Sequence, residues 1–190
     1  TFVGMFEFDY IKDAHAAPFD EKGQAQKPLF TKEYMHVRKD VHFERGMQCV
    51  DCHTSIDVHG DGNIYPATLY QVEISCYDCH GTPEKYPWEL SVGHGTPVTL
   101  DGARGTYKKN SVEYLLTSRG NVKENWRREG DMSYVYSRFT GKKHEIPLLK
   151  RINETDTYKT KQGKVAMSTI HKHMEKMECY ACHATWAPQC

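Results

Sequence analysis

Six of the seven cysteines in this chain fall into one short pattern, Cys-x-x-Cys-His, which occurs three times. The pattern ends in a histidine each time, at His53, His80 and His183. Two thiols at this spacing can form thioethers to the two vinyl groups of one haem, and the adjoining histidine then reaches the iron from one face. We therefore expect three c-type haems, with thioether bonds at Cys49, Cys52, Cys76, Cys79, Cys179 and Cys182.

Zinc is the main alternative for these cysteine pairs. The first two pairs read C-x2-C-x23-C-x2-C, which is slightly long for a four-cysteine zinc ribbon. Zinc does not require a histidine after each pair, and the third pair has no fourth pair with which to complete a second site. A redox dithiol needs only one pair, and disulfides between neighbouring cysteines would close very small loops. Haem remains the favoured interpretation.

The composition agrees with a chain that is completed by a large apolar cofactor. Lys plus Arg and Asp plus Glu each number 25, so no basic excess points to a nucleic-acid partner. The hydrophobic fraction is 38% and the mean hydropathy is −0.72, both low for 190 residues. Such a chain builds only a small aliphatic core, and haem plates would supply the missing apolar surface.

The residues at the two ends of the chain bear on whether it is a mature, secreted or partial chain. No apolar run approaches the length that crosses a bilayer, and no signal peptide follows Thr1. Haem is attached to this motif outside the cytoplasm, so we expect a mature or partial chain in the periplasm or outside the cell. Cys190 alone lacks a motif. It is either a free or buried thiol or, as we expect, the first cysteine of a partial or shared fourth motif.

The chain divides into four expected regions. They are an N-terminal extended arm (1–32), a region with two haem motifs (33–94), a β-rich haem-free insert (95–165), and a region with the third motif (166–190). A lead-in helix is expected at 33–47 and a turn at 59–63. The fold class expected is a multihaem cytochrome c, mostly irregular, with short helices around the haems and the small β insert.

Within the insert, Met132, Tyr134 and Tyr136 alternate, and a turn at 140–143 follows. A second hairpin is expected around Gly163, over residues 158–165. We interpret this insert as a scaffold and not as a substrate site.

Residues 166–178 have helical spacing. Met167, Ile170, Met174 and Met177 share one face of this expected helix. Methionine can bind haem iron, but a stripe at this spacing is more often packing.

An internal repeat links two of the haem motifs. The segment that begins at His42 and leads to Cys49 aligns with the segment from His173 to Cys179, and both contain His-x-Glu-basic before Met-x-Cys. The short lead-in makes it awkward for either histidine to reach around its own haem. His42 and His173 are therefore the leading candidates for distal iron ligands to neighbouring haems.

The other histidines form a second group of candidate iron ligands. Eleven histidines are present, and three belong to the motifs. Bis-histidine ligation is the economical assumption, and it implies low potentials and saturated iron. The further distal candidates are His171, as the alternative to His173, with His59, His36 and His94, while His15 and His144 are weaker.

The segments 42–62 and 172–190 resemble parts of large bacterial and archaeal multihaem c-type cytochromes, which include secreted electron-conducting and octahaem-type proteins. The resemblance covers about a third of the chain. It implies closely spaced haems in a continuous chain, and it supports Cys190 as a truncated haem anchor. The long haem-free insert and the low motif count depart from an octahaem protein, so the chain is expected to be a portion or subunit of something larger.

The function expected is electron transfer through a chain of covalently bound haems outside the cytoplasm, in a larger conduit or filament. The expected partners are other cytochromes or redox proteins, or further copies in an assembly, with no nucleic acid and no transmembrane segment. The alternative is part of a multihaem redox enzyme of the nitrite, hydroxylamine or tetrathionate type, with one open haem. A zinc-stabilised binding module is the third possibility.

Overall fold

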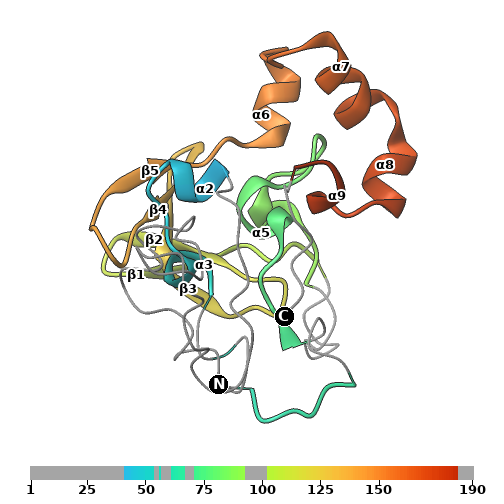
Figure 1. Ribbon diagram of the computed structural model, residues 1–190. Helices are drawn as coiled ribbons and strands as arrows, with labels where there is room; N and C mark the ends of the chain where they lie inside the picture. The colour runs from blue at the N-terminus through green and yellow to red at the C-terminus, as the bar shows by residue number, and fades with distance from the viewer. Residues whose placement is uncertain (1–40, 54–55, 57–60, 67–70, 93–101, 184–190) are drawn as a thin grey trace, which may run out of the picture.

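The computed structural model describes residues 41–53, 56, 61–66, 71–92 and 102–183 (Figure 1). The expected arm at 1–32 and Cys190 lie outside this part of the chain. The lead-in helix appears only as α2 (Val41–Glu44), since 33–40 are also outside it. In the described half of the turn expected at 59–63, the Asn63 amide donates to Asp61 Oδ1 at 2.9 Å, as in an Asx turn.

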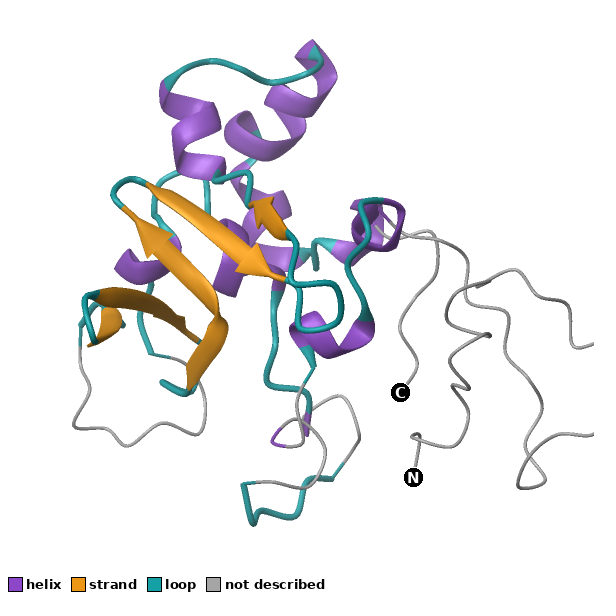
Figure 2. Cartoon of the chain, turned by 90° about the vertical axis from the view of Figure 1, so that its left-hand side faces the viewer, coloured by secondary structure: helices purple, strands orange, loops and turns teal. Residues whose placement is uncertain are grey.

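An antiparallel sheet forms the centre of the structure (Figure 2). Its strands follow chain order: β1 (Thr106–Lys109), β2 (Val112–Leu116), β3 (Val122–Glu129), β4 (Met132–Tyr136) and β5 (Lys143–Glu145). Asn110 and Ser111, both with positive φ, make the tight turn between β1 and β2, as two-residue hairpin loops require. The hairpin expected from the alternation at Met132–Tyr136 is confirmed, because β4 pairs with β5.

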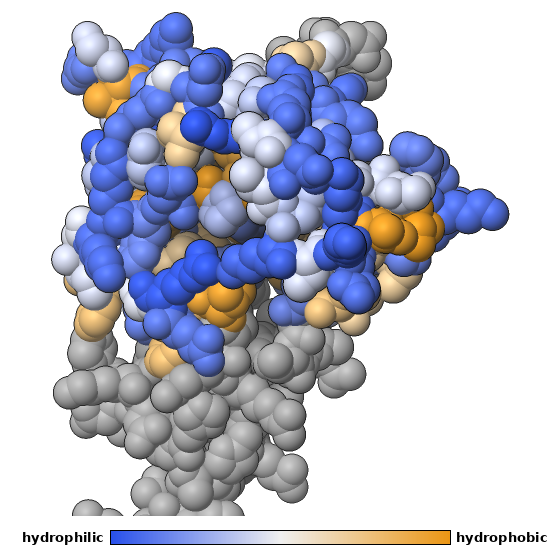
Figure 3. Space-filling view, turned by 90° about the horizontal axis from the view of Figure 1, so that it is seen from above, coloured by the Kyte–Doolittle hydropathy of each residue, from blue (hydrophilic) through white to orange (hydrophobic). Residues whose placement is uncertain are grey.

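The apolar core of the described residues is small. It comprises Trp88, Leu115, Trp126, Val135, Ile146 and Leu148. Trp126 and Val135 are directly paired across β3 and β4, so both side chains lie on the same face of the sheet. The turn of 3-10 helix η3 (Pro87–Glu89) brings Trp88 to this face, where Tyr86 stacks on it at 4.8 Å. Figure 3 shows a mainly hydrophilic surface with scattered apolar patches, in keeping with the low hydropathy.

The helices are short, and several coincide with haem motifs. The first motif forms α3 (Cys49–Cys52), the second forms α5 (Cys76–His80), and the third contains α9 (Tyr180–His183). Between the sheet and α9 the chain forms an arc of helical segments beyond the sheet (Figure 1). These segments are α6 (Leu149–Glu154), α7 (Lys161–Lys164), the π-helical turn η4 (Val165–Thr169) and α8 (His171–Lys176).

The hairpin expected around Gly163 is wrong. Lys161–Lys164 are helical, because the Thr160 hydroxyl accepts a hydrogen bond from the Gly163 amide at 2.9 Å and so caps the first turn. A glycine in a short polar segment suggests a hairpin turn, but it does not exclude a helical turn when a Thr precedes it and can cap the first turn.

The prediction of one continuous helix at 166–178 is wrong. It is interrupted at Ile170, whose φ of −96° and ψ of 84° leave the helical region, between η4 and α8. Ser168 donates from its hydroxyl to the Lys164 carbonyl at 2.8 Å, a local bond that competes with regular helix geometry. As a result the methionine stripe is not a continuous buried face, and Met177 is exposed.

Candidate haem-binding site

The first haem motif is held against the sheet by Asp51, the third residue of its Cys-x-x-Cys pattern. Asp51 is fully buried. One carboxylate oxygen accepts from the Gln48 amide at 2.8 Å, at the start of α3, and the other accepts from the Arg138 amide at 2.6 Å, just after β4. One side chain thus caps the motif helix and attaches it to the turn between β4 and β5.

The backbone of this motif is attached to β3 as well. The Asp51 carbonyl accepts from Trp126 Nε1 at 3.0 Å and from Asn125 Nδ2 at 2.9 Å, and all of these groups are buried. The buried Lys123 ammonium donates to the Cys52 carbonyl, at the end of α3 where the helix dipole favours a cation. Contacts from three side chains of one strand therefore fix where the first pair of cysteines lies.

The second motif repeats this arrangement with different partners. Asp78 is fully buried, and one of its oxygens accepts from the Ser75 amide at 2.9 Å at the start of α5. The other oxygen forms an ion pair with the buried Arg104 guanidinium. Arg104 also donates to the Ser91 carbonyl at 3.2 Å. Burial raises the pKa of the Asp78 carboxyl, and the Arg104 charge opposes that rise.

The segment before the second motif is also fixed by a buried carboxylate. Glu73 accepts from the buried Thr117 hydroxyl and from Asn121 Nδ2, the latter at 2.9 Å, in the turn between β2 and β3. Cys79 packs against the sheet core. The β insert therefore positions both early motifs, which supports its interpretation as a scaffold.

The third motif has Ala181 where the first two have aspartate. Ala181, Cys182 and His183 are exposed, on α9 at the end of the helical arc (Figure 1). Cys179 of this motif lies beside Cys76 and Tyr77 of the second motif, and His183 lies near His80. The bond from the Cys76 thiol lowers the pKa of Cys179 to about 6, although partial burial opposes this.

The three motifs come together with α5 in the middle. Cys76 on α5 lies beside Cys179 of the third motif. Cys79 on the same helix lies near Cys52 of the first motif, and a charge on Cys52 affects the pKa of Cys79. Burial, first, and the Cys52 charge, second, raise the pKa of the Cys79 thiol. Residues about a hundred positions apart in the sequence thus form one cluster of haem-attachment groups.

His80 is prepared to bind a metal through one nitrogen. Its Nδ1 lies 2.8 Å from the Pro147 carbonyl, which can only accept, so Nδ1 carries the proton and Nε2 retains its lone pair. Burial lowers the pKa of His80, and the nearby His42 and His183 lower it further. The neutral ring is the form that ligates iron, and the carbonyl fixes its orientation.

His42 lies beside His80, with ring centroids 6.2 Å apart and ring planes tilted by 45°. A bond between a metal and an imidazole nitrogen is about 2 Å long, so two imidazoles on opposite sides of one metal ion place their centroids roughly 6 Å apart. The structure therefore brings His42 to the histidine of the second motif and not to that of the motif which its own helix precedes. The two imidazoles could therefore hold one haem iron between them.

The other expected ligands are distributed as follows. His173 on α8 is partly buried, and its Nδ1 lies 3.2 Å from the Ala166 carbonyl, which again leaves Nε2 as the nitrogen with a lone pair. His171 on the same helix is exposed. The candidates His36, His59 and His94, the weaker His15, and Cys190, the expected fourth anchor, lie outside the described residues. In the described part of the chain, no three His, Cys, Asp or Glu side chains converge as a metal-ion cluster.

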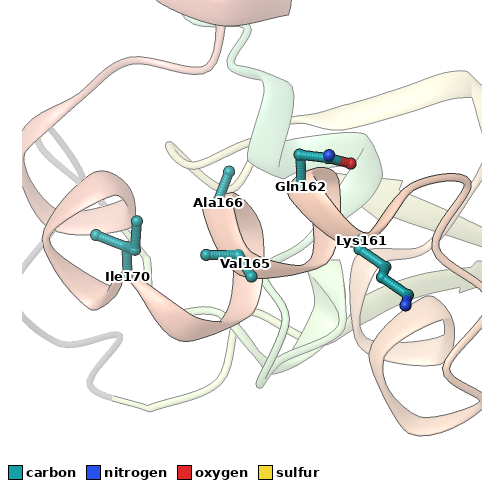
Figure 4. A pocket seen from close by; sticks show the side chains of 5 residues that line it. All are labelled: Lys161, Gln162, Val165, Ala166 and Ile170. Atoms are coloured by element: carbon teal, nitrogen blue, oxygen red, sulfur yellow. The ribbon is translucent and has the colours of Figure 1, made fainter.

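Shallow hollows among the described residues include one beside the second motif and one on the helical arc. One borders the second motif and is lined by residues of α5, α8 and the intervening loops, including Tyr77, Arg104 and Met174. The other lies on the helical arc, where Val165, Ala166 and Ile170 gather beside Lys161 and Gln162 (Figure 4). The lining of the second hollow is mainly aliphatic, with one lysine and one glutamine at its edge.

Asp51, Asp78 and Arg104 were not predicted from the sequence as parts of this site. A signal was present, because the first two motifs read Cys-x-Asp-Cys-His and the third reads Cys-x-Ala-Cys-His. An acidic residue two positions after the first residue of a helix suggests a cap, but its burial and its partners depend on the sheet. Arg104 carries no local signal, since 26 positions separate it from Asp78.

Comparison with known families agrees with the haem interpretation. Residues 8–81 match the family model for cytochrome c554 and c-prime, and the matched segment contains the first two motifs. The match supports a c-type cytochrome with covalently bound haem and haem-based electron transfer. Among curated proteins and among solved structures, no significant match to this chain is found. No helix within the described ranges is long and apolar enough to span a bilayer.

Proposed function

We propose that this protein carries three covalently bound haems and passes electrons between them, outside the cytoplasm, as part of a larger conduit. The observation that carries this proposal is the meeting of the three motifs around α5, with Cys76 beside Cys179 and Cys79 near Cys52. Haems attached at these positions would lie within one cluster, as sequential electron transfer requires. A fourth haem anchor at Cys190 and redox-protein partners or further copies belong to the same proposal.

The chain's own residues hold and orient the haems. The cysteines of each motif anchor one haem by thioether bonds, and the histidine of the motif binds its iron. Asp51 and Asp78 keep two of these motifs fixed on the sheet, so that little rearrangement is needed between oxidation states. The haem itself supplies the one-electron chemistry.

His42 is proposed as the distal ligand of the second haem, opposite His80. Its ring spacing from His80 and the protonated Nδ1 of His80 support this assignment. His173 is proposed in the same role for another haem, on the basis of the repeated lead-in. Two histidines on one iron saturate it, and this suits electron transfer better than substrate binding.

The proposal is tested first by counting haems. A pyridine haemochrome assay combined with intact mass should give three haems per chain, or more if Cys190 participates. A polypeptide mass with no added haem would refute the proposal, and bound zinc in such a sample would establish the zinc alternative.

The distal assignment is tested with His42→Ala in the haem-loaded protein. One haem should become high-spin in the EPR spectrum, bind CO when reduced, and rise in potential, while every thioether remains. Glu44→Gln, on the same exposed helix, is the matched control and should leave the spectrum unchanged. An unchanged low-spin spectrum in His42→Ala would remove His42 from the ligand set.

The enzyme alternative is tested on the unmodified protein. If every iron has two histidine ligands, the reduced protein should bind CO slowly or not at all. A dominant high-spin ferric signal with rapid CO binding would instead favour an open haem, and thus a multihaem redox enzyme.

A further inference from the structure

His144 has a buried ring nitrogen for which the structure provides no hydrogen-bond partner. Its Nε2 is shielded from solvent, and no described residue bonds to it. A buried polar atom without a partner is destabilising, so such atoms are uncommon unless a ligand or water occupies the position. Imidazole nitrogen is also the usual protein ligand to haem iron.

The sheet fixes the direction in which His144 points. Along one row of the sheet, Trp126 pairs with Val135 and Val135 pairs with His144, so all three side chains lie on the same face. Trp126 donates from this face to the Asp51 carbonyl of the first motif at 3.0 Å. The row that ends in His144 is therefore the row against which the first motif is attached.

The ring of His144 also lies beside the chain that enters the first motif. A side-chain carbon built on Gly46 would meet His144 Cε1 at 3.9 Å, and Gly46 comes three residues before Cys49. Gly46 has a φ of +89°, which few other residues adopt. This turn brings the lead-in of the first motif close to the imidazole.

We propose that His144 Nε2 is the distal iron ligand of the haem attached at Cys49 and Cys52. His42 lies beside the histidine of the second motif, so it is not placed to serve the first haem, whereas His144 lies beside the chain that enters the first motif. A ligand on a paired strand is held more rigidly than one on a loop, and this suits an iron that changes only its charge. The inference rests on the proposed haem function.

The test uses the haem-loaded His144→Ala protein, with Glu145→Gln as the control. Glu145 is the next residue of β5, is exposed, and points to the opposite face. In His144→Ala, one haem should convert to high spin, bind one equivalent of CO, and return to low spin when imidazole is added. Glu145→Gln should show none of these changes.

A second variant identifies the haem and separates the possible failures. In a Cys49→Ala, Cys52→Ala background, which lacks the first haem, adding His144→Ala should produce no further high-spin signal. A further high-spin haem in that background would overturn the assignment, as would a fully low-spin His144→Ala protein with a normal haem count. If His144→Ala fails to accumulate, His144→Met is used in its place. This variant should remain low-spin, with the reduction potential of one haem raised. Unchanged reduction potentials of all haems would overturn the proposal. Absence of haem from the parent protein would instead refute the proposed function.

Discussion

The first two haem motifs and the third are alike in sequence but are held in different ways. Asp51 and Asp78 are buried and attach their motifs to the sheet, whereas Ala181 offers no side-chain bond and its motif lies on an exposed helix. The third motif is positioned by contacts of Cys179 with the second motif and by the helical arc. Haem attachment thus requires only the Cys-x-x-Cys-His pattern, while rigid placement requires a further residue within it.

The largest expected effect follows from removing the carboxylate of the second motif. Asp78→Ala leaves the buried Arg104 guanidinium without its partner, and we expect unfolding of the haem-loaded protein to become easier by about 3–5 kcal/mol. Denaturant titration followed by circular dichroism measures this. Asp131→Ala, in an exposed turn between β3 and β4, is the control and should change stability by less than about 0.5 kcal/mol. Equal effects of the two variants would contradict the role given to Asp78.

A smaller effect is expected at the first motif, and the reverse change at the third motif sharpens the comparison. Asp51→Ala leaves the Gln48 and Arg138 amides without their acceptor, and the free energy of unfolding should fall by about 2 kcal/mol.

Ala181→Asp places a carboxylate at an exposed position of α9, so the free energy of unfolding should change by less than about 0.5 kcal/mol. Both are measured by the same titration. A strong stabilisation by Ala181→Asp would show that the third motif has a docking partner after all.

The smallest effect concerns the cysteines that join the second and third motifs. In the haem-free chain, the pKa of about 6 makes Cys179 a thiolate above pH 6, whereas the pKa of Cys76 is raised by the same contact. Iodoacetamide at pH 7 should therefore alkylate Cys179 several times faster than Cys76, and the preference should disappear as the pH falls below 6. Peptide mass spectrometry gives both rates. The control is the chain unfolded in urea, where Cys179 and Cys76 should react at similar rates. Equal alkylation rates of the two cysteines in the absence of urea would contradict the contact between them.

Local patterns predicted elements wherever neighbouring residues alone decide the structure. The hairpin of β4 and β5 follows from the alternation at Met132–Tyr136, because strand side chains alternate between the faces of a sheet. The hairpin around Gly163 was wrong, since the Thr160 cap stabilised a helical turn instead. The break at Ile170 was also missed, because the methionine spacing continues through it.

The sequence by itself determined the haem chemistry, because thioether attachment and the first iron ligand need only five consecutive residues. It also indicated His42 as a ligand to a neighbouring haem, through the repeated lead-in. Only the tertiary structure decided which histidine His42 faces, that the motifs meet around α5, and that Asp78 is neutralised by Arg104. It also decided that His144, a weak candidate in the sequence, has a buried nitrogen on the face that carries the first motif. These features depend on residues brought together by strand pairing across long separations, and no local pattern records which distant side chains a strand will face.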